Sequence, residues 1–202
     1  MNDPHDFITW LFAGLATNSD IVIEGVEYEK MKLDVLEKIL AKMNVDVDLH
    51  SPSLILKPQL ANLKPVNIFS GSYPMFTTEW QVLISPLLTQ IKGESRVVET
   101  LFANRMQHWI ELAKMGASCS FFKDLKYHES EGRPRAVKVT GPQNLQGAEV
   151  DARDVRTGAA LIIASLIANG KTTINNSEHI DRGYEAVHEK LKKSGVSVYI
   201  IS

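Results

Sequence analysis

Apolar residues recur along the chain in patterns that predict helices and strands in a repeating order. Segments 7–17, 80–91 and 157–168 are apolar on almost every side, which is typical of helices buried on all faces. Segments 36–43, 106–113 and 184–191 have apolar residues spaced i, i+3, i+4 and i+7, which predicts amphipathic helices. The chain therefore alternates a fully buried helix with a half-buried one.

Short β-branched segments between the helices predict strands. These are residues 21–23, 45–49, 54–56, 65–69, 96–99, 118–121, 137–140, 171–174 and 196–201. We expect 45–49 to pair with 54–56 around a Ser51-Pro52 turn, and 118–121 to pair with 137–140. Polar segments 123–135 and 178–182 are expected to be loops, and a helix is expected to begin at Gly183.

The order helix, strand, loop, helix, strand occurs three times. In each copy the two helices end about 25 residues apart, at Ser19 and Asn44, at Gly93 and Gly116, and at Gly170 and Gly195. Each repeat leaves an apolar helix that only its neighbours can cover. The pattern predicts one α/β domain over residues 1–202, with helices inside, sheets outside and repeats of approximately 1–60, 61–140 and 141–202.

Composition narrows the possible functions. The 202 residues are 44% hydrophobic and carry a formal net charge of −2 without a long basic run, so the sequence predicts no nucleic-acid partner. No apolar run reaches the roughly 18 residues that a membrane helix needs, and no signal peptide is apparent, so we expect a soluble, cytoplasmic protein. The single cysteine, Cys119, falls in a predicted strand and is expected to be a buried, inert thiol.

Arginines at the starts of predicted helices are the first candidates for chemistry. Asp154 and Arg156 stand just ahead of the buried helix 157–168, and Arg182 stands just ahead of Gly183. Helix N-termini carry unpaired N–H groups and a partial positive charge, so arginines there suit a phosphate or carboxylate. Taken singly, Asp154 is also a common N-cap, and each arginine a common surface residue. Arg105 lies between the strand and the second helix of the middle repeat, which is the place that Arg182 occupies in the third repeat. This equivalence favours an anion site.

Glu79 is the candidate general base. It follows Thr78 at the start of the helix 80–91, where Thr78 is a plausible N-cap and Glu79 an ordinary acid of the first turn. The functional hypothesis for Glu79 is that its carboxylate accepts a proton from substrate. The sequence has no Cys/His metal spacing, phosphate-binding Gly-rich loop or Gly-x-Ser-x-Gly elbow, so it predicts neither a metal nor a cofactor.

Two stretches of the third repeat, Ala152-Arg-Asp-Val-Arg-Thr-Gly-Ala-Ala160 and His179-Ile-Asp-Arg-Gly-Tyr-Glu185, resemble the C-terminal domain of the UDP-N-acetylglucosamine 1-carboxyvinyltransferases. These enolpyruvyl transferases act in peptidoglycan precursor synthesis and cell wall biogenesis. The likeness extends over nearly the whole chain at the level of repeats and fades before Ser70. It implies an inside-out α/β barrel of three repeated units, and a second, N-terminal domain that this chain lacks.

The resemblance also implies the reaction and its residues. The enolpyruvyl group of phosphoenolpyruvate would move to the 3′-hydroxyl of UDP-N-acetylglucosamine with release of phosphate, with Glu79, Asp154 and Arg182 as catalytic residues. Arg156 and Arg182 would hold phosphoenolpyruvate, and Leu101 and Glu79 would contact the UDP-sugar. The complete set of implied substrate-binding residues is Glu79, Leu101, Phe102, Arg105, Arg156 and Arg182.

The chain departs from this family in two ways. The family pattern Pro-Gly-Phe-Pro-Thr-Asp reads Pro74-Met-Phe-Thr-Thr-Glu79 here, so the base is one methylene longer. The other domain would carry the catalytic Cys loop and a phosphoenolpyruvate-binding Lys, neither of which this chain supplies, so the chain alone is expected to be incomplete and inactive.

Alternative functions therefore remain open. One is a shikimate-branch enolpyruvyl transferase domain, which shares the fold and phosphoenolpyruvate but not the His179–Glu185 stretch. Another is a non-catalytic binding or regulatory domain of the same fold, favoured by the altered Glu79 motif and opposed by Asp154, Arg156 and Arg182. An RNA-processing relative is disfavoured by the neutral charge balance.

Overall fold

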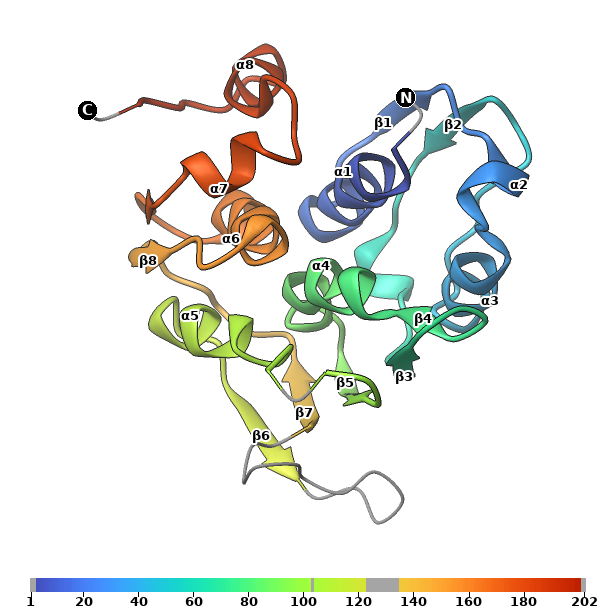
Figure 1. The fold of residues 1–202 in the computed structure, drawn as a ribbon, viewed down its shortest axis with the longest axis horizontal. Helices are drawn as coiled ribbons and strands as arrows, with labels where there is room; N and C mark the ends of the chain where they lie inside the picture. Colours follow the sequence, from blue (N-terminus) through green and yellow to red (C-terminus); the bar gives the residue numbers. More distant parts are fainter. Residues whose placement is uncertain (1–2, 103, 123–134, 201–202) are drawn as a thin grey trace.

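Three apolar helices pack against one another in the middle of the molecule (Figure 1). They are α1 (Pro4–Thr17), α4 (Thr78–Leu88) and α6 (Val155–Ile167), and each contacts the other two. Leu11, Leu83 and Ile163, one from each helix, are fully buried. The prediction of three helices buried on nearly all sides is confirmed, because apolarity around the whole circumference leaves no face suited to water.

The structure, a computed structural model, describes residues 3–102, 104–122 and 135–200. Shorter helices surround the three inner ones: α2 (Tyr28–Met31), α3 (Asp34–Lys42), the 3-10 turn η1 (Leu60–Asn62), α5 (His108–Lys114), α7 (Glu178–Asp181) and α8 (Val187–Lys193). No helix among these residues is long and apolar enough to cross a membrane.

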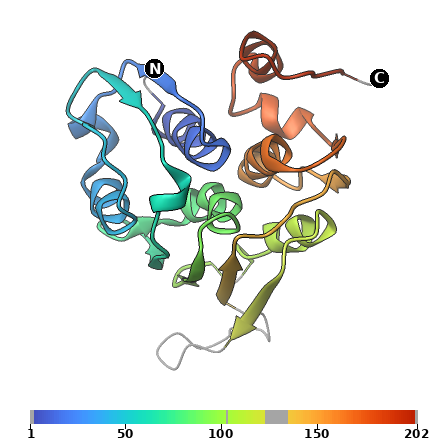
Figure 2. The same cartoon turned by 180° about the vertical axis from the view of Figure 1, so that it is seen from behind.

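Three separate sheets lie outside the inner helices (Figures 1 and 2). The strands of the first sheet are the antiparallel pair β1 (Ile21–Glu24) and β2 (Ser53–Leu56). The five strands of the second run in the order β4 (Phe76–Thr77), β3 (Asn67–Gly71), β5 (Gly93–Glu99), β7 (Ala136–Gly141) and β6 (Cys119–Phe122). The third sheet is the parallel pair β8 (Glu149–Asp151) and β9 (Thr173–Asn175).

The pairing in the five-stranded sheet matters for the site. Strand β5 lies parallel to β3, with Ser70 opposite Glu99, so the loops that follow both strands leave the same edge. On its other side β5 is antiparallel to β7, which also pairs with β6 as the sequence predicts. Cys119 lies in β6, half-buried, and burial raises the pKa of its thiol, which disfavours the reactive thiolate.

Two predicted strands are wrong. Residues 45–49 form no strand, because β2 pairs instead with β1, with Ile21 opposite Leu56. Residues 196–200 also form no strand, although Val196 and Val198 pack against the core. A strand needs a neighbouring strand to take its hydrogen bonds, and β-branched content alone does not provide one.

The predictions around residue 182 are also wrong. Residues 178–181 form the short helix α7 instead of a loop, and α8 begins at Val187 instead of Gly183. Ala186 has a left-handed backbone (φ +48°), which interrupts the helical path between the two. Arg182 therefore follows α7 and does not precede a helix N-terminus.

Two smaller predictions differ in detail. Ile110, expected on the buried face of α5, is 52% exposed, and Leu112 is buried instead. Thr78 is not the N-cap of α4, because the cap residue is Thr77, whose side chain makes no capping hydrogen bond. Of the predicted loop 123–135, residues 123–134 lie outside the described residues.

Candidate functional site

The N-termini of the three inner helices meet at one end of the molecule. Each brings a polar residue near its first turn: His5 on α1, Glu79 on α4 and Arg156 on α6. Arg156 bonds Glu79, and the pKa of the His5 imidazole is lowered by burial first and then by the nearby charges of Arg156 and Arg105. Three helix N-termini pointing to one place concentrate partial positive charge there.

Glu79 lies between two arginines. Its Oε2 accepts a hydrogen bond from Nε of Arg156 at 2.8 Å, and its Oε1 forms an ion pair with Nη2 of Arg105. The side chains are 29% exposed for Glu79, 24% for Arg105 and 14% for Arg156, so the cluster is mostly shielded yet open to a ligand. Each carboxylate oxygen is engaged by one arginine, and the loss of either arginine partner would make the carboxylate a stronger proton acceptor.

Tyr184, a tyrosine for which sequence analysis predicts no functional role, holds the guanidinium of Arg156. The Arg156 Nη1 donates to the Tyr184 hydroxyl at 3.0 Å, and that hydroxyl also bonds Oγ1 of Thr9 on α1 at 2.8 Å. Tyr184 is 2% exposed, and burial raises the pKa of its phenol. The sequence placed Tyr184 on a helix face, but it precedes α8 and links α1 to α6.

Asp154 is the N-cap residue of α6, which is one of the two roles that the sequence suggests for it. Its Oδ1 accepts hydrogen bonds from the backbone N–H groups of Arg156 at 2.9 Å and Thr157 at 2.8 Å. The carboxylate also opposes the effect of burial, which lowers the pKa of Arg105. Asp154 thus sets the direction of the first turn of α6 and adds a negative charge beside the two arginines.

A buried glutamate, Glu111, forms hydrogen bonds with the segment 151–153, which immediately precedes Asp154. Glu111 on α5 is fully buried, and its carboxylate accepts from Nε of Arg153 at 2.8 Å and from the backbone N–H of Asp151 at 3.0 Å. Lys114 lies 2.7 Å from the same carboxylate, and these partners together hold the pKa of Glu111 below its usual value in spite of burial. Glu111 is a structural anchor for this side of the site.

The loop after β5 carries two of the expected substrate residues. Leu101 is 45% exposed and Phe102 is 51% exposed, so two adjacent apolar side chains of this loop face solvent. At the far end of the loop, the backbone carbonyl of Arg105 lies 3.0 Å from Nδ1 of His108 and accepts from Nε2 of Gln81 at 3.2 Å. The backbone of Arg105 is thereby fixed, which helps to aim its guanidinium at Glu79.

Arg182 is not part of this cluster in the structure. It is exposed, and its Nη1 lies 3.5 Å from Nδ1 of His179. The next residue, Gly183, does lie beside the cluster, because a Cβ there would stand 3.6 Å from Nη1 of Arg156 and would overlap with Val155. The structure therefore brings together Glu79, Arg105, Arg156 and Asp154, and places Arg182 one residue away from contact with them.

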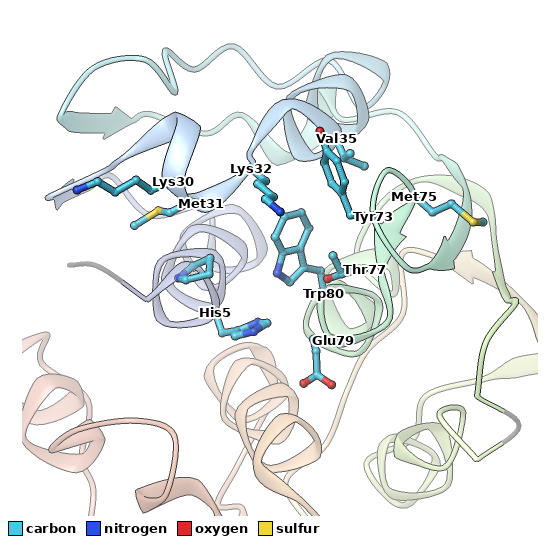
Figure 3. A pocket seen from close by; sticks show the side chains of 11 residues that line it. His5, Lys30, Met31, Lys32, Val35, Tyr73, Met75, Thr77, Glu79 and Trp80 are labelled. Atoms are coloured by element: carbon cyan, nitrogen blue, oxygen red, sulfur yellow. The ribbon is translucent and has the colours of Figure 1, made fainter.

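A cavity of about 360 Å³ opens beside Glu79 (Figure 3). Lys30 and Met31 of α2 line one side, and Thr77 and Trp80 at the start of α4 line another. His5 also lines it, and burial together with Arg156 lowers the pKa of this histidine to about 4, so it is neutral at pH 7. The cavity is mainly apolar, in contrast to the charged cluster at its edge.

These groups are suited to hold a small anion and to contact a hydroxyl group. Two guanidinium groups and three helix N-termini favour phosphate or carboxylate, and Glu79 is the acid nearest to them. Among the described residues, no group of three or more His, Cys, Asp or Glu side chains is placed to hold a metal ion.

Comparison with known proteins identifies the class. The family model described as EPSP synthase (3-phosphoshikimate 1-carboxyvinyltransferase) matches residues 1–191, and the chain belongs to this enolpyruvyl transferase family. Within it, the chain is similar to enzymes named UDP-N-acetylglucosamine 1-carboxyvinyltransferase. It is 36% identical to such an enzyme of Bacillus subtilis over 191 residues, which cover 95% of this chain and 42% of the relative.

A relative with the same enzyme name from Caldanaerobacter subterraneus is 37% identical over 95% of this chain and 43% of the relative. The chain therefore spans less than half the length of these transferases. Solved structures agree in fold: the enolpyruvyl transferase NikO from Streptomyces tendae has a TM-score of 0.82 at 24% identity, covering 96% of this chain and 43% of that one. EPSP synthase from Acinetobacter baumannii has a TM-score of 0.67 at 19% identity, covering 98% and 43%.

Proposed function

We propose that this chain forms one half of the substrate cleft of an enolpyruvyl transferase that moves the enolpyruvyl group of phosphoenolpyruvate to the 3′-hydroxyl of UDP-N-acetylglucosamine. The observation that carries the proposal is the Glu79 carboxylate held between Arg105 and Arg156 where three helix N-termini meet. The names of the relatives supply the substrates. In this proposal the protein acts in the cytoplasm, in synthesis of the peptidoglycan precursor.

The proposed roles are those that the resemblance implies; the positions of Glu79, Arg105 and Arg156 support theirs, whereas the role of Arg182, which lies outside the cluster, rests on the resemblance alone. Arg156 and Arg182 bind the phosphate or carboxylate of phosphoenolpyruvate, Arg105 and Phe102 line the cleft, and Leu101 and Glu79 contact the UDP-sugar. In the addition step the 3′-oxygen bonds C2 of phosphoenolpyruvate, Glu79 takes its proton, and the C2=C3 double bond opens as C3 gains a proton from an acid of the second domain. In the elimination step C3 loses a proton, the double bond re-forms, and the C2–O bond to phosphate breaks as phosphate leaves.

Binding of the anion would also prepare the base. Glu79 is engaged by two arginines, and an incoming phosphate or carboxylate competes for those same guanidinium groups. When Arg156 turns to phosphoenolpyruvate, Oε2 of Glu79 becomes available to the sugar hydroxyl. Asp154 stays at the reacting centre as the cap that orients the first turn of α6.

We further propose that residues 1–202 are one domain, an inside-out α/β barrel of three units, approximately 1–60, 61–140 and 141–202. The three inner helices and three outer sheets support this arrangement. A complementary N-terminal domain would close over the Glu79 cluster and supply the Cys loop and Lys that this chain lacks.

The test is release of phosphate from phosphoenolpyruvate and UDP-N-acetylglucosamine, by the chain alone and with an N-terminal domain of the family added in trans. We expect release only when the second domain is present. No release by halves that are folded and demonstrably associated would contradict the proposal. Shikimate 3-phosphate serves as the competing acceptor, because preferential use of it would place the chain in the shikimate branch.

A non-catalytic binding domain is the second candidate. The specific observation in its favour is that both oxygens of Glu79 are already occupied by arginines, which is the arrangement of a structural ion pair. A domain of this kind would bind phosphoenolpyruvate or the UDP-sugar, measured by calorimetry, without any release of phosphate.

A further inference from the structure

A second buried glutamate lies under the loop that carries Leu101 and Phe102. Glu99 is the last residue of β5, its side chain is fully buried, and burial raises the pKa of its carboxyl. An acid is costly to bury unless hydrogen bonds compensate. The partners of Glu99 therefore indicate what it stabilises.

The hydrogen-bond partners of Glu99 are the backbone of the loop and one neighbouring strand, and the charge of Arg135 also favours the ionised carboxylate. Oε1 accepts hydrogen bonds from the N–H groups of Leu101 at 2.8 Å and Phe102 at 2.9 Å, and Oε2 accepts from the Ser70 hydroxyl at 2.9 Å. Because both N–H groups turn inward to one oxygen, the backbone folds over the carboxylate. The two apolar side chains remain about half exposed.

The same turn is tied to the segment that leads to Glu79. The N–H of Thr100 donates to the Ser70 carbonyl at 2.9 Å, and its hydroxyl donates to that carbonyl at 2.8 Å. The Thr100 hydroxyl also lies 3.8 Å from the sulfur of Met75, which lines the cavity beside Glu79. The loops after β3 and β5 are therefore fastened to each other as they leave the sheet.

We propose that Glu99 is a positioning residue: its carboxylate holds the turn at residues 100–102 so that Leu101 and Phe102 face the substrate cleft. The part concerning substrate rests on the proposed function. The part concerning the turn does not, and the two are tested separately.

The first test replaces Glu99 with Met, which has a similar size and no acceptor for the two N–H groups. Hydrogen exchange of the Leu101 and Phe102 amides is then measured by NMR. We expect both amides to exchange at least about tenfold faster than in the wild type, since each loses its acceptor. The control is Glu94→Met on the same strand, where the side chain is 39% exposed, and the two amides should be unchanged.

A conservative variant separates positioning from mere stability. In Glu99→Gln the amide oxygen still accepts from both N–H groups and the amide nitrogen can donate to Ser70. We expect this variant to restore the protection of Leu101 and Phe102. If these two amides exchange in the folded wild type as fast as unbonded amides, the proposal is overturned, whether or not the Met variant folds.

The functional arm measures binding of UDP-N-acetylglucosamine with the N-terminal domain in trans. We expect Glu99→Met to weaken binding at least about tenfold while Glu99→Gln binds close to wild type. Equal binding by the Met variant, with the two amides deprotected, would overturn the role toward substrate. Absence of binding by the wild type, with the amide results as expected, would refute the proposed function and leave the structural role of Glu99 intact.

Discussion

Single residues behind the charged cluster determine its geometry. Tyr184 is an example, because its hydroxyl joins Thr9 of α1 to Arg156 of α6, and Arg156 in turn bonds Glu79 of α4. A hydrogen-bond chain of this kind fixes the guanidinium before any ligand arrives.

Replacing Tyr184 with Phe tests that link. The ring still fills its space, but Arg156 loses a partner in a buried site, so we expect the free energy of unfolding to fall by about 1–2 kcal/mol. Urea denaturation measures it. Tyr199→Phe, at a position 80% exposed, is the control and should not change stability. Equal stability of the two variants would exclude a structural role for the Tyr184 hydroxyl.

For Arg182 we expect an effect on binding and almost none on stability, because this residue is exposed and lies outside the cluster. Arg182→Ala should change the free energy of unfolding by less than about 0.5 kcal/mol. With the N-terminal domain present, it should weaken phosphoenolpyruvate binding about tenfold, through loss of a charged hydrogen bond. Arg96→Ala on β5 is the matched control. If both variants bind phosphoenolpyruvate equally well, Arg182 does not belong to the site.

At the scale of helices, close packing of α6 against α7 positions the first turn that carries Arg156. Gly158 lies in this contact, since a Cβ there would overlap with Ile180 and come within 3.1 Å of Cβ of Ala152. Alanine at this position would gain helix propensity of about 1 kcal/mol but would force the two helices apart.

We therefore expect Gly158→Ala to lower the melting temperature, although the same change in an exposed helix would raise it. Differential scanning calorimetry provides the measurement. Ser165→Ala, on the same helix at a half-buried position, serves for comparison and should have a smaller effect. An increase in stability for Gly158→Ala would show that the contact between α6 and α7 is loose.

Helix α5 contains a histidine whose charge opposes folding. Burial lowers the pKa of His108 to about 4, against 6.5 in an unfolded chain, while its contact with the Arg105 carbonyl partly opposes this. Between pH 6.5 and pH 4 the unfolded chain therefore binds a proton at His108 that the folded chain does not. The contribution of His108 to the free energy of unfolding has its full value above pH 6.5 and decreases as the pH falls toward 4. We expect a loss of about 3 kcal/mol over that range from His108.

The variant His108→Gln isolates this effect. It should be less stable than the wild type at pH 7, yet it should lose less stability between pH 7 and pH 4.5, as measured by urea denaturation. His5 also has a lowered pKa, but it is present in both proteins and cancels in the comparison. Identical pH dependence of the two proteins would contradict the lowered pKa of His108.

The same elements indicate what sequence can and cannot predict. The inner helices were predictable because their apolar residues surround the whole helix, as around Ile163 in α6. Residues 178–181 were not predicted as a helix, because so short a polar segment shows no periodicity. No functional or positioning role was predicted for Glu99 and Tyr184, because the sequence does not show whether a side chain is buried or to which groups it forms hydrogen bonds.

Across the whole molecule, the fold brings together residues far apart in the chain. Thr9 and Tyr184 are 175 residues apart and share a hydrogen bond, and Glu79 and Arg156 are 77 residues apart. The repetition along the sequence assigned Arg105 and Arg182 to equivalent places before the second helices of two repeats, and the Glu79 segment to the place of Asp154 and Arg156 before the first helices. In the structure Arg105 and Arg156 meet at Glu79, and Arg182 does not meet them. The repetition placed Arg182 with them on the expectation of a helix at Gly183, and the left-handed residue Ala186 prevents that helix.

The size of the chain agrees with the proposal that a second domain completes the site. It covers about 42% of its Bacillus subtilis relative, and the Glu79 cluster stays partly exposed at one end of the inner helices. We expect this end to become buried when the complementary domain closes on substrate.

The most direct test of the central claim compares Glu79→Gln with Glu94→Gln in the phosphate-release assay, with the N-terminal domain added. Glutamine keeps the size of Glu79 but cannot take the proton of the sugar hydroxyl, so we predict a rate at least about hundredfold below wild type. Glu94→Gln should release phosphate at the wild-type rate. A Glu79→Gln variant as active as the wild type would contradict the assignment of Glu79 as the base of this transferase.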